Sequence, residues 1–464
     1  MLLDFDLKPS DKLAAIDDAG AQLTYGDLVA LRGQLSSVLP PRELVFCLCE
    51  NRVGALAGFL ALYDCKDVCL LLSAHIDSGL LAALCETYHP SYFWMPESKA
   101  PEFNYDIVHR FHGYVLCKTG QQAPAMHVDL SMLMTTSGTT GSPKLVRHKY
   151  GNIESNARNV ASVFGWTEDE RGIIDLPMQY TMGLNVILSH LYAGAMVLLA
   201  EANLMSPKLW QFIKEKKGTN LTGVPFSYEI LQRLRFTRMD LPYLTTLAEG
   251  GGKLPDSLFK TFAEYAEVSG KRFFATFGTT ETSARLAYLP PKDAATHIGS
   301  IGQAIPEGKL LLVDDDGCEI TQSDQEGELL YEGPNVTMGY GTCIEDLQKG
   351  DEFCGVYATG DIARRDDDGY FYIVGRKKRF LKLYGLRVSL DQSEKIISEH
   401  FGVECACTGD DTQMRIYVTD AHLVEDVQNL MVEKTGLKAK SFEVKAIDAI
   451  PRFESGKVNY RLLS

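Results

Sequence analysis

The middle of the chain alternates short apolar runs with longer amphipathic stretches, and this alternation constrains the fold more than any other feature. The strand-like runs are LSMLMTT (130–136), GIIDLP (172–177), AMVLLA (195–200), NLTGV (220–224), LTTLAEGG (244–251) and RFFATFG (272–278). Helix-like stretches such as 206–218 and 255–270 separate them. The pattern is typical of βαβ units, in which helices join parallel strands, and it predicts an α/β fold.

After about residue 296 the pattern changes to short strand-like runs joined by glycine-rich turns. These runs are KLLLVDDDG (309–317), GELLYEG (327–333) and GYFYIVG (369–375). They predict a smaller β-rich unit. From about Lys378 the pattern is mixed again, with a helix expected near 421–435. A chain of 464 residues is long enough for two or three domains.

The balance of charge argues against nucleic acid and anionic membranes as partners. The chain has 46 Lys and Arg against 61 Asp and Glu, a formal net charge of −15. Its 11 cysteines are scattered, and the close pairs Cys47/Cys49 and Cys405/Cys407 lack the two-residue spacing of common zinc and redox sites. The acidic start MLLDFDLKPSDK is unlike a secretory signal. We therefore expect reduced thiols and a cytoplasmic protein.

The stretch 177–200 carries no Asp, Glu, Lys or Arg and is long enough to cross a bilayer. Polar residues such as Gln179, Asn185 and His190 interrupt it, and Gly194 separates a helix-like half from the strand-like AMVLLA. We predict a buried helix followed by a core strand, and no membrane span.

The sequence TTSGTTGSPK (135–144) follows the apolar run 130–134 and precedes a helix expected to begin near Gly151. Its glycines let backbone amides turn toward one point, and its hydroxyls and lysine add donors and positive charge, so the loop can bind phosphates. It is not a Walker motif, because no Gly-Lys-Ser/Thr ends it. Alone it indicates an anion site at the edge of a parallel sheet. The predicted site residues are Thr136, Ser137, Gly138, Thr139, Thr140, Gly141 and Lys144.

Further motifs follow in a fixed order and give this loop a more specific meaning. They are TYGDL (24–28), FGTTE (277–281), YATGD (357–361), GRKKRFLKLYGLRV (375–388) and PRFESGK (451–457). Together with TTSGTTGSPK they resemble the signatures of the adenylate-forming enzymes, which include acyl-CoA synthetases, peptide-synthetase adenylation domains and firefly-type luciferases. The resemblance spans nearly the whole chain.

The resemblance implies a domain organisation. It implies a large N-terminal adenylation domain over 1–377, in which about 297–377 form a distorted β-barrel-like subdomain. A small, mobile α+β domain over 378–464 would turn about a hinge near Lys378, so that one site serves two half-reactions. In the second pose the segment 381–387 would line the path of the incoming thiol. The alternative is a fixed linker between the domains.

The resemblance also implies a reaction and its cofactors. A carboxylate attacks the α-phosphate of ATP to give acyl-AMP and pyrophosphate, and a thiol or another nucleophile then displaces AMP. By resemblance the glycine-rich loop holds the β- and γ-phosphates, Glu281 binds Mg²⁺ and Lys457 approaches the reacting oxygens during adenylation.

The same resemblance assigns residues to the nucleotide. Thr280 would contact the α-phosphate, Phe277 would stack on adenine, and Asp361 and Arg376 would hold the ribose. The nucleotide-binding residues outside the loop are therefore Gly251, Phe277, Gly278, Thr280, Asp361 and Arg376.

Ordinary structural interpretations exist for these residues. Glu281 and Asp361 could be exposed loop acids, and Phe277 could belong to the core. Lys457 and the basic run 376–379 could be solvated surface charges. The context of the motifs favours functional roles except at Lys377, where the solvated interpretation holds.

The expected acid pocket departs from the family pattern. PMQYTMG (177–183) places Tyr180 where many relatives have a histidine, and LDQSE (390–394) replaces the usual Pro-x-Glu-Ile-Glu. No Asp lies between 177 and 190 to pair with an α-amino group, which argues against an amino acid. The pocket residues are mostly neutral and favour an uncharged acyl or aryl group. They are Tyr180, Met182, Asn185, Val224, Phe226, Gly250 and Gly252.

We therefore expect an ATP- and Mg²⁺-dependent acid–thiol ligase that passes the acyl group to coenzyme A. The sequence leaves open a carrier-protein phosphopantetheine or an amine as the acceptor. It also leaves open a catalytically silent homologue that binds nucleotide or a partner protein.

Overall fold

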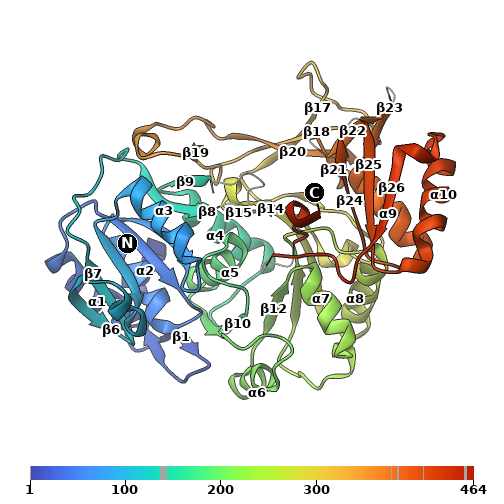
Figure 1. The fold of residues 1–464 in the computed structure, drawn as a ribbon. Coiled ribbons are helices and arrows are strands. Elements are labelled where there is room, and N and C mark those ends of the chain that lie inside the picture. Colours follow the sequence, from blue (N-terminus) through green and yellow to red (C-terminus); the bar gives the residue numbers. More distant parts are fainter. Residues whose placement is uncertain are drawn as a thin grey trace. The chain divides into compact units, whose positions relative to one another are not determined.

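The computed structural model describes residues 2–135, 144–377, 379–383, 386–410, 412–453 and 457–463 (Figure 1). The chain divides into two compact units. The first comprises 1–298, 304–309 and 332–357, and the second comprises 299–303, 310–331 and 358–464. The hinge predicted at Lys378 lies outside the described residues and stays a prediction.

The larger sheet of the first unit has the strand order β16-β15-β14-β13-β12-β10-β11-β1-β2. The six strands from β14 to β1 in this order are parallel, and β15 and β2 add antiparallel neighbours at the two ends. The strands are β1 (Leu13–Asp17), β2 (Gln22–Thr24), β10 (Arg171–Ile174), β11 (Met196–Leu199), β12 (Asn220–Gly223), β13 (Thr246–Glu249), β14 (Arg272–Thr279), β15 (Ala284–Leu289) and β16 (Gln303–Ala304).

The second sheet of this unit has the order β19-β9-β8-β4-β3-β5-β7-β6. Its strands are β3 (Leu44–Cys49), β4 (Val68–Ser73), β5 (Tyr92–Pro96), β6 (Asp106–Phe111), β7 (Tyr114–Lys118), β8 (Leu130–Thr135), β9 (Leu145–Lys149) and β19 (Tyr340–Gly341). The strands β8, β4, β3 and β5 are parallel.

The helices of the first unit are α1 (Tyr25–Val38), α2 (Val53–Asp64), α3 (Ser78–Tyr88), α4 (Asn152–Phe164), α5 (Thr181–Tyr192), α6 (Pro207–Lys216), α7 (Pro225–Arg233) and α8 (Asp256–Val268). The motif TYGDL begins α1 through a capping box, in which Asp27 N donates to Thr24 Oγ1 at 3.0 Å and Thr24 N donates to Asp27 Oδ2 at 2.9 Å. The apolar helix α2 shares one core with β1 and β11 of the larger sheet and β3 and β8 of the other.

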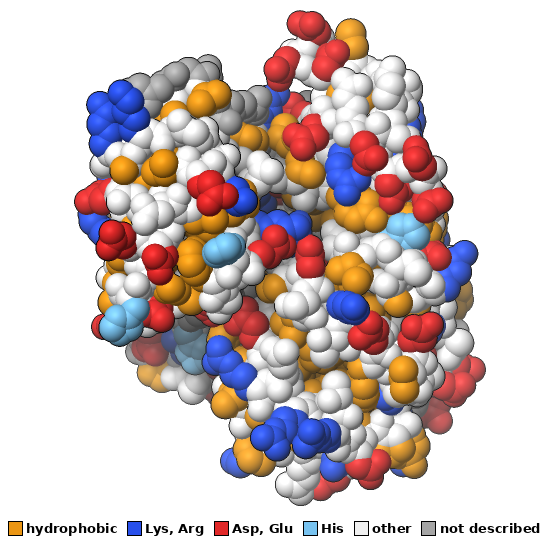
Figure 2. Space-filling model, turned by 90° about the vertical axis from the view of Figure 1, so that its right-hand side faces the viewer, with side chains coloured by type: hydrophobic (Ala, Val, Ile, Leu, Met, Phe, Trp, Pro, Cys, Tyr) orange, Lys and Arg blue, Asp and Glu red, His pale blue; other side chains and the backbone are white. Residues whose placement is uncertain are grey.

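The apolar stretch 177–200 forms the buried helix α5 and the strand β11, as the sequence predicted. Over the residues that the structure describes, no helix is long and apolar enough to span a bilayer. Acidic and basic side chains are interspersed on the face shown in Figure 2.

The strand β9 was missed. The sequence analysis expected the glycine-rich loop to lead directly to a helix near Gly151, but β9 pairs antiparallel with β8 before α4 begins at Asn152. Its central residues Arg147 and His148 are charged or polar and are nevertheless fully buried. Their hydrogen-bond partners lie far away in the sequence, so hydrophobic periodicity could not reveal the strand.

The second unit contains the short strands of the β-rich stretch together with the mixed C-terminal segment. Its sheets have the orders β17-β18-β20-β21, β22-β23 and β24-β25-β26. The elements are β17 (Lys309–Val313), β18 (Gly327–Glu332), β20 (Val356–Arg365), β21 (Phe371–Arg376), β22 (Phe380–Leu383), β23 (Leu386–Ser389), α9 (Leu390–Phe401), β24 (Cys405–Asp410), β25 (Gln413–Val418), α10 (Val424–Thr435) and β26 (Phe442–Ala446). Its core lies between α9, α10 and the last three strands.

Candidate active site

Several predicted pocket residues meet at one edge of the larger sheet. The strands β10, β12 and β13 are parallel, so their carboxyl ends share the edge where such sheets bind ligands. A Cβ added at Gly250 would lie 2.6 Å from Met182 Cε and 2.5 Å from Thr276 Oγ1. At Gly251, where φ is +82°, it would lie 3.2 Å from Val224 Cγ1. The loop after β13 therefore needs glycine to approach the starts of α5 and α7.

The remaining pocket residues differ in how they are placed. Tyr180 is half-buried and is the N-cap residue of α5, whereas Phe226 lies in the first turn of α7 and is 37% exposed. A Cβ at Gly252 would lie 3.2 Å from Pro225 Cγ. Asn185 is buried inside the unit, one turn of α5 beyond Met182.

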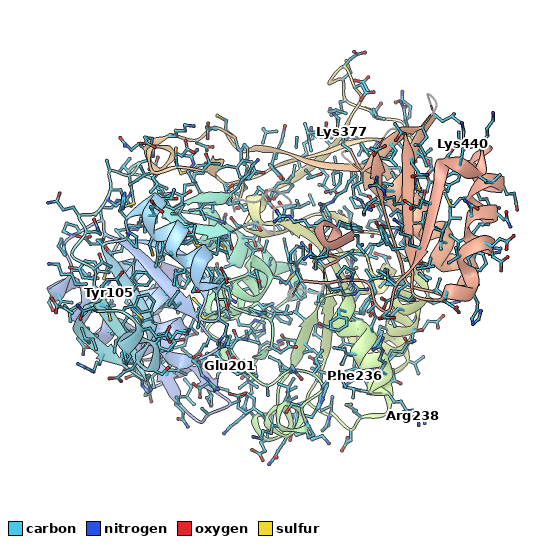
Figure 3. All side chains as sticks on the ribbon, in the orientation of Figure 1. Tyr105, Glu201, Phe236, Arg238, Lys377 and Lys440 are labelled. Carbon is cyan, nitrogen blue, oxygen red and sulfur yellow. The ribbon has the colours of Figure 1, made fainter. Side chains whose placement is uncertain are left out.

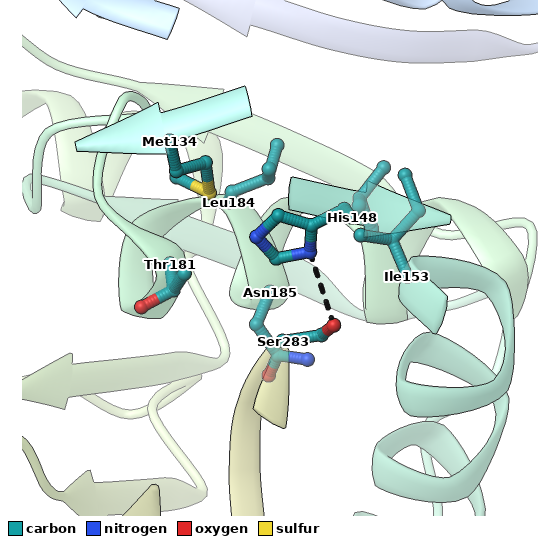
Figure 4. A pocket seen from close by; sticks show the side chains of 8 residues that line it. Met134, His148, Ile153, Thr181, Leu184, Asn185 and Ser283 are labelled. Atoms are coloured by element: carbon teal, nitrogen blue, oxygen red, sulfur yellow. Dashed lines mark hydrogen bonds between the residues drawn. The ribbon is translucent and has the colours of Figure 1, made fainter. Parts of the chain in front are cut away.

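A small cavity lies beside Asn185 (Figure 4). It is lined by Met134, His148, Ile153, Thr181, Leu184, Asn185, Leu188 and Ser283. Its volume of about 10 Å³ is close to the minimum for one water molecule.

Two carboxyl groups, the half-buried Asp175 and the buried Glu249, lie at the same sheet edge. Asp175 follows β10 and Glu249 ends β13. Burial raises the pKa of Asp175 to about 7 and that of Glu249 to about 8. At neutral pH, Glu249 therefore holds its proton and Asp175 is close to its midpoint.

Glu281 lies in a short 3₁₀ turn, Thr280–Thr282, between β14 and β15. Its Oε1 accepts a hydrogen bond of 2.7 Å from the Tyr340 hydroxyl, and its backbone carbonyl accepts one of 3.0 Å from Thr337 N. The Tyr340 bond orients the carboxylate while leaving Oε2 without a partner among the described residues. A Cβ at Gly278 would lie 1.4 Å from Ala284 O, so only glycine allows the two strands to meet before this turn.

Buried polar side chains hold the end of this turn. Ser283 and Ala284 have φ values of +56° and +110°, a strained conformation for residues with side chains. Asn335 Nδ2 donates to Thr282 O at 2.7 Å, and Ser283 Oγ donates to Asn335 O at 3.0 Å. His148 Nδ1 lies 3.2 Å from Ser283 Oγ (Figure 4), and burial lowers the pKa of His148 to about 3, so the ring is neutral and donates from Nδ1.

The Tyr340 ring links Glu281 to the end of the glycine-rich loop. Lys144 Nζ lies 4.9 Å from the centre of the Tyr340 ring, within the range of a cation–π contact. Burial and the neighbouring Glu281 raise the pKa of Tyr340, so its hydroxyl remains a donor at neutral pH. Lys144 and Glu281, which lie far apart in the sequence, thus contact the same aromatic side chain.

In the second unit, Asp361 and Arg376 face each other across the antiparallel pair β20/β21. Asp361 is 2% exposed, and its Oδ1 accepts a hydrogen bond of 3.0 Å from Arg376 Nε. Its Oδ2 has no partner among the described residues. Burial raises the pKa of Asp361, while Arg376 opposes the shift. An exposed guanidinium beside a buried, half-satisfied carboxylate is suited to a ligand that carries hydroxyl groups.

Two lysines of the sequence motifs, Lys377 and Lys457, also lie in the second unit. Lys377 (Figure 3) is exposed and its Nζ lies 2.7 Å from Glu328 Oε2, which fits the solvated surface charge that was expected. Lys457 is exposed, and its backbone carbonyl accepts a hydrogen bond of 2.8 Å from Phe453 N. Its role stays a prediction.

Comparison with known proteins decides the family. A family model described as "AMP-binding enzyme" matches residues 5–341, well over half of the chain. The chain belongs to the AMP-binding enzyme family. The resemblance to adenylate-forming enzymes inferred from the motifs is therefore confirmed.

Curated relatives of this AMP-binding enzyme are named as CoA ligases. It is 25% identical over 441 residues to the 2-succinylbenzoate–CoA ligase of Enterococcus faecalis, covering 91% of this chain and 88% of that one. It is 27% identical to the oxalate–CoA ligase of Arabidopsis thaliana, covering 72% and 67%. Among solved structures, the O-succinylbenzoate coenzyme A synthetase of Bacillus subtilis in complex with AMP matches with a TM-score of 0.78 at 21% identity, covering 98% and 95%. The predicted α/β fold with a large and a small domain is confirmed.

Among the predicted site residues, the structure describes Glu281, Asp361, Arg376 and the segments around Gly250 and Met182, and their roles stay predictions. The loop residues Thr136, Ser137, Gly138, Thr139, Thr140 and Gly141, together with Lys378, lie outside the described residues.

The sequence analysis missed Tyr340, the buried His148 and the buried Arg285. Tyr340 had a signal, because VTMGYG (336–341) places an aromatic residue between two glycines. His148 and Arg285 had none, because nothing in the sequence shows that these polar residues are buried.

Proposed function

We propose that this AMP-binding enzyme is an AMP-forming acid–CoA ligase. The observation that carries the proposal is the braced turn in which Tyr340 orients Glu281, found in a chain whose family is AMP-binding and whose relatives are named CoA ligases. The protein activates a carboxylic acid and transfers the acyl group to the thiol of coenzyme A.

The chemistry consists of two displacements. A carboxylate oxygen of the acid attacks the α-phosphorus of ATP, the bond to the β-phosphate bridge breaks, and pyrophosphate leaves as acyl-AMP forms. The CoA thiolate then attacks the acyl carbon and AMP leaves with the bonding electron pair. Both steps bring anions together, so catalysis depends on fixed cations and donors.

Glu281 fits a site for Mg²⁺. Its carboxylate is a hard oxygen ligand with one oxygen fixed by Tyr340 and the other without a partner among the described residues. No cluster of three or more His, Cys, Asp or Glu side chains suited to a metal occurs in the described part of the chain. One carboxylate is enough where phosphate oxygens and water complete the coordination, and the ion then neutralises phosphate charge.

The other residues act on the nucleotide and the reacting carboxylate. Lys144 and the loop 136–141 hold the β- and γ-phosphates, and Thr280 contacts the α-phosphate. Phe277, Gly251 and Gly278 form the adenine site, while Asp361 Oδ2 and Arg376 bind the ribose hydroxyls. Lys457 stabilises the oxygens on which charge develops during adenylation.

We also propose a cytoplasmic location. ATP and coenzyme A are intracellular reactants, and the cysteines of the described residues are free thiols.

An acid panel tests the function. The full chain with MgATP, with and without CoA, is incubated with fatty, aryl, hydroxy and dicarboxylic acids, and pyrophosphate, AMP and acyl-CoA are measured. We expect pyrophosphate release that depends on the acid and acyl-CoA that depends on CoA. Absence of adenylate with every acid, or formation of ADP, would contradict the proposal. Discharge by a phosphopantetheinyl carrier or an amine, with CoA inert, would instead change the acceptor.

Lys457→Ala tests the proposed division of labour. Adenylation should fall by roughly 100-fold or more, because a positioned charge is lost at the reacting oxygens. Thioester formation from supplied acyl-AMP should survive. Lys434→Ala, on the exposed end of α10, is the matched control. Equal loss of both half-reactions would show that Lys457 does not act in adenylation alone.

A further inference from the structure

Arg285 on β15 is a buried cation that the proposed chemistry does not use. It is 1% exposed. Its Nη1 donates to Asn185 Oδ1 at 2.6 Å and its Nη2 to Thr222 Oγ1 at 3.5 Å, while its Cζ lies 4.8 Å from the centre of the Phe164 ring. Its Nε has no acceptor, and no carboxylate pairs with it, among the described residues. All of its partners are neutral.

This arrangement is costly for a folded protein. Burying a charge without a counter-ion and burying an N–H without an acceptor both destabilise the folded state. Burial lowers the pKa of Arg285 to about 9, which still leaves the guanidinium charged at neutral pH. The neighbouring His190 does not compensate for the charge, because it is a neutral ring between Val186 O and Asn220.

Arg272 lies near the same group of aromatic rings as Arg285, but it is paired with a carboxylate. Its Cζ lies 5.6 Å from the ring centre of Trp166 and 5.8 Å from that of Phe274, which stacks on Phe164. Its Nη2 lies 4.0 Å from Glu170 Oε1, and its side chain is 37% exposed. The fold thus supplies an acid and solvent to Arg272 and supplies neither to Arg285.

The contacts of Arg285 place it next to the candidate acid pocket. Asn185 lies three residues after Met182 on α5, so the two share a face of the helix. Thr222 lies on β12, two residues before Val224. On the neighbouring strand, Arg285 is paired with Gly278. The partners of Arg285 therefore belong to the segments that meet at Gly250.

We infer that Arg285 binds a second carboxylate of the acid substrate, so that this enzyme activates dicarboxylic acids. The inference rests on the proposed function and names its substrate class. A carboxylate matches the guanidinium fork, gives Nε the acceptor that it lacks and supplies the missing negative charge. A neutral acceptor would meet only the first two needs. The neutral acid expected from the sequence came from pocket residues that did not include Arg285.

The Asn185 amide lies where this carboxylate would bind. Its Oδ1 accepts from Arg285, and its Nδ2 donates to Asn156 Oδ1 at 2.5 Å. Asn156 Nδ2 in turn donates to Arg285 O at 2.6 Å, which closes a ring of three residues. Because Arg285 is enclosed, binding of the second carboxylate requires the Asn185 amide to turn away.

The test compares each dicarboxylic acid with its half-amide, which has the same shape and one charge fewer. Acid-dependent pyrophosphate release by the full chain gives kcat/KM for aliphatic and aryl pairs. We expect the best dicarboxylic acid to exceed its half-amide by roughly 100-fold. This comparison uses the unmodified protein and stands even where a variant fails to fold.

The variants Arg285→Met and the matched Arg272→Met distinguish a substrate-binding role of Arg285 from a purely structural one. Arg285→Met should lower kcat/KM for the dicarboxylic acid by about the same factor and lower that for the half-amide much less, because the half-amide loses hydrogen bonds but no charge pairing. Its unfolding midpoint should be no lower than that of the unmodified protein, whereas a purely structural arginine would lower it. Arg272→Met should keep the selectivity.

The outcomes distinguish this inference from the proposed function. Equal kcat/KM for dicarboxylic acids and half-amides, or selectivity that survives in Arg285→Met, overturns the inference and leaves the ligase intact. Failure to activate any acid overturns the proposed function itself.

Discussion

Arg147 and Arg285 are both completely buried, yet the fold satisfies only one of them. Arg147 uses every guanidinium nitrogen: Nε donates to Tyr340 O at 2.9 Å, Nη2 to Met338 O at 3.1 Å and Nη1 to Gly350 O at 3.3 Å. Arg285 has two neutral side-chain acceptors and an Nε that has none among the described residues.

The two arginines also differ in charge compensation. Glu352 pairs with Arg147, whereas no carboxylate in the described part of the chain pairs with Arg285. A buried arginine whose charge is paired and whose N–H groups all have acceptors within the protein acts as a structural clamp. A buried arginine without a paired carboxylate and without an acceptor for every N–H is suited to a ligand that supplies a negative charge and acceptor oxygens.

The Arg147 clamp also serves the site, because it binds the segment 338–352 to β9. That segment carries Tyr340, whose hydroxyl orients Glu281. Arg147 therefore affects the reaction indirectly, by positioning Tyr340 and Glu281. Arg285 is proposed to contact the substrate directly.

Replacing Arg147 should have the largest effect on stability. Arg147→Met leaves at least three carbonyls without a donor and should lower the free energy of unfolding by about 3–5 kcal/mol, measured by urea denaturation. Arg285→Met should cause no such loss. If both variants lost the same stability, the distinction between clamp and binding group would fail.

Gly278→Ala should be the next most destabilising change, by about 3 kcal/mol, because the new Cβ would lie 1.4 Å from Ala284 O next to Arg285. Gly33→Ala in α1 is the matched control, since nothing lies within 4 Å of its Cβ, and it should stabilise by about 0.5–1 kcal/mol. If the Gly278→Ala protein were as stable as the control, β14 and β15 would not approach each other as closely at Gly278 and Arg285 as the structure shows.

Tyr340→Phe tests whether the Tyr340 hydroxyl, which the Arg147 clamp positions, orients the Glu281 carboxylate. Loss of one hydrogen bond to the Glu281 carboxylate, worth about 1 kcal/mol, should raise the Mg²⁺ concentration for half-maximal adenylation by roughly 5-fold. The unfolding midpoint should change little. Tyr243→Phe, on a residue that is 48% exposed, is the control. An unchanged Mg²⁺ dependence would remove Tyr340 from the metal site.

The smallest expected effect concerns the pKa of His190. Burial lowers it to about 4, and the positive charge of Arg285 contributes. Because the unfolded value is about 6.5, stability is lost as the pH falls from about 6.5 toward 4. Arg285→Met should raise the folded pKa of His190 and so reduce the loss at pH 5, whereas Arg147→Met should leave this pKa unchanged. Histidine NMR titration measures both, and no change in Arg285→Met would contradict the placement of its charge.

The sequence predicts the regular part of this molecule well and the two arginines not at all. Elements that pack into the core show regular spacings or runs of apolar residues, and these patterns can be recognised in the sequence. Such elements are β14, α8, α5 and β11. Glu281 and Asp361 could be proposed as site residues because motifs mark them. Arg147 and Arg285 depend on partners such as Met338 and Asn185, which lie far away in the sequence. Composition alone would place both arginines at the surface.

The central claim is that the acid is activated by forming a bond to the α-phosphate of ATP. Isotope transfer tests it most directly: the full chain is given an acid labelled with ¹⁸O in its carboxyl groups, together with MgATP and CoA, and the products are analysed by mass spectrometry. The mechanism predicts one ¹⁸O atom in each AMP and unlabelled pyrophosphate. Unlabelled AMP, or label in inorganic phosphate formed with ADP, would contradict it.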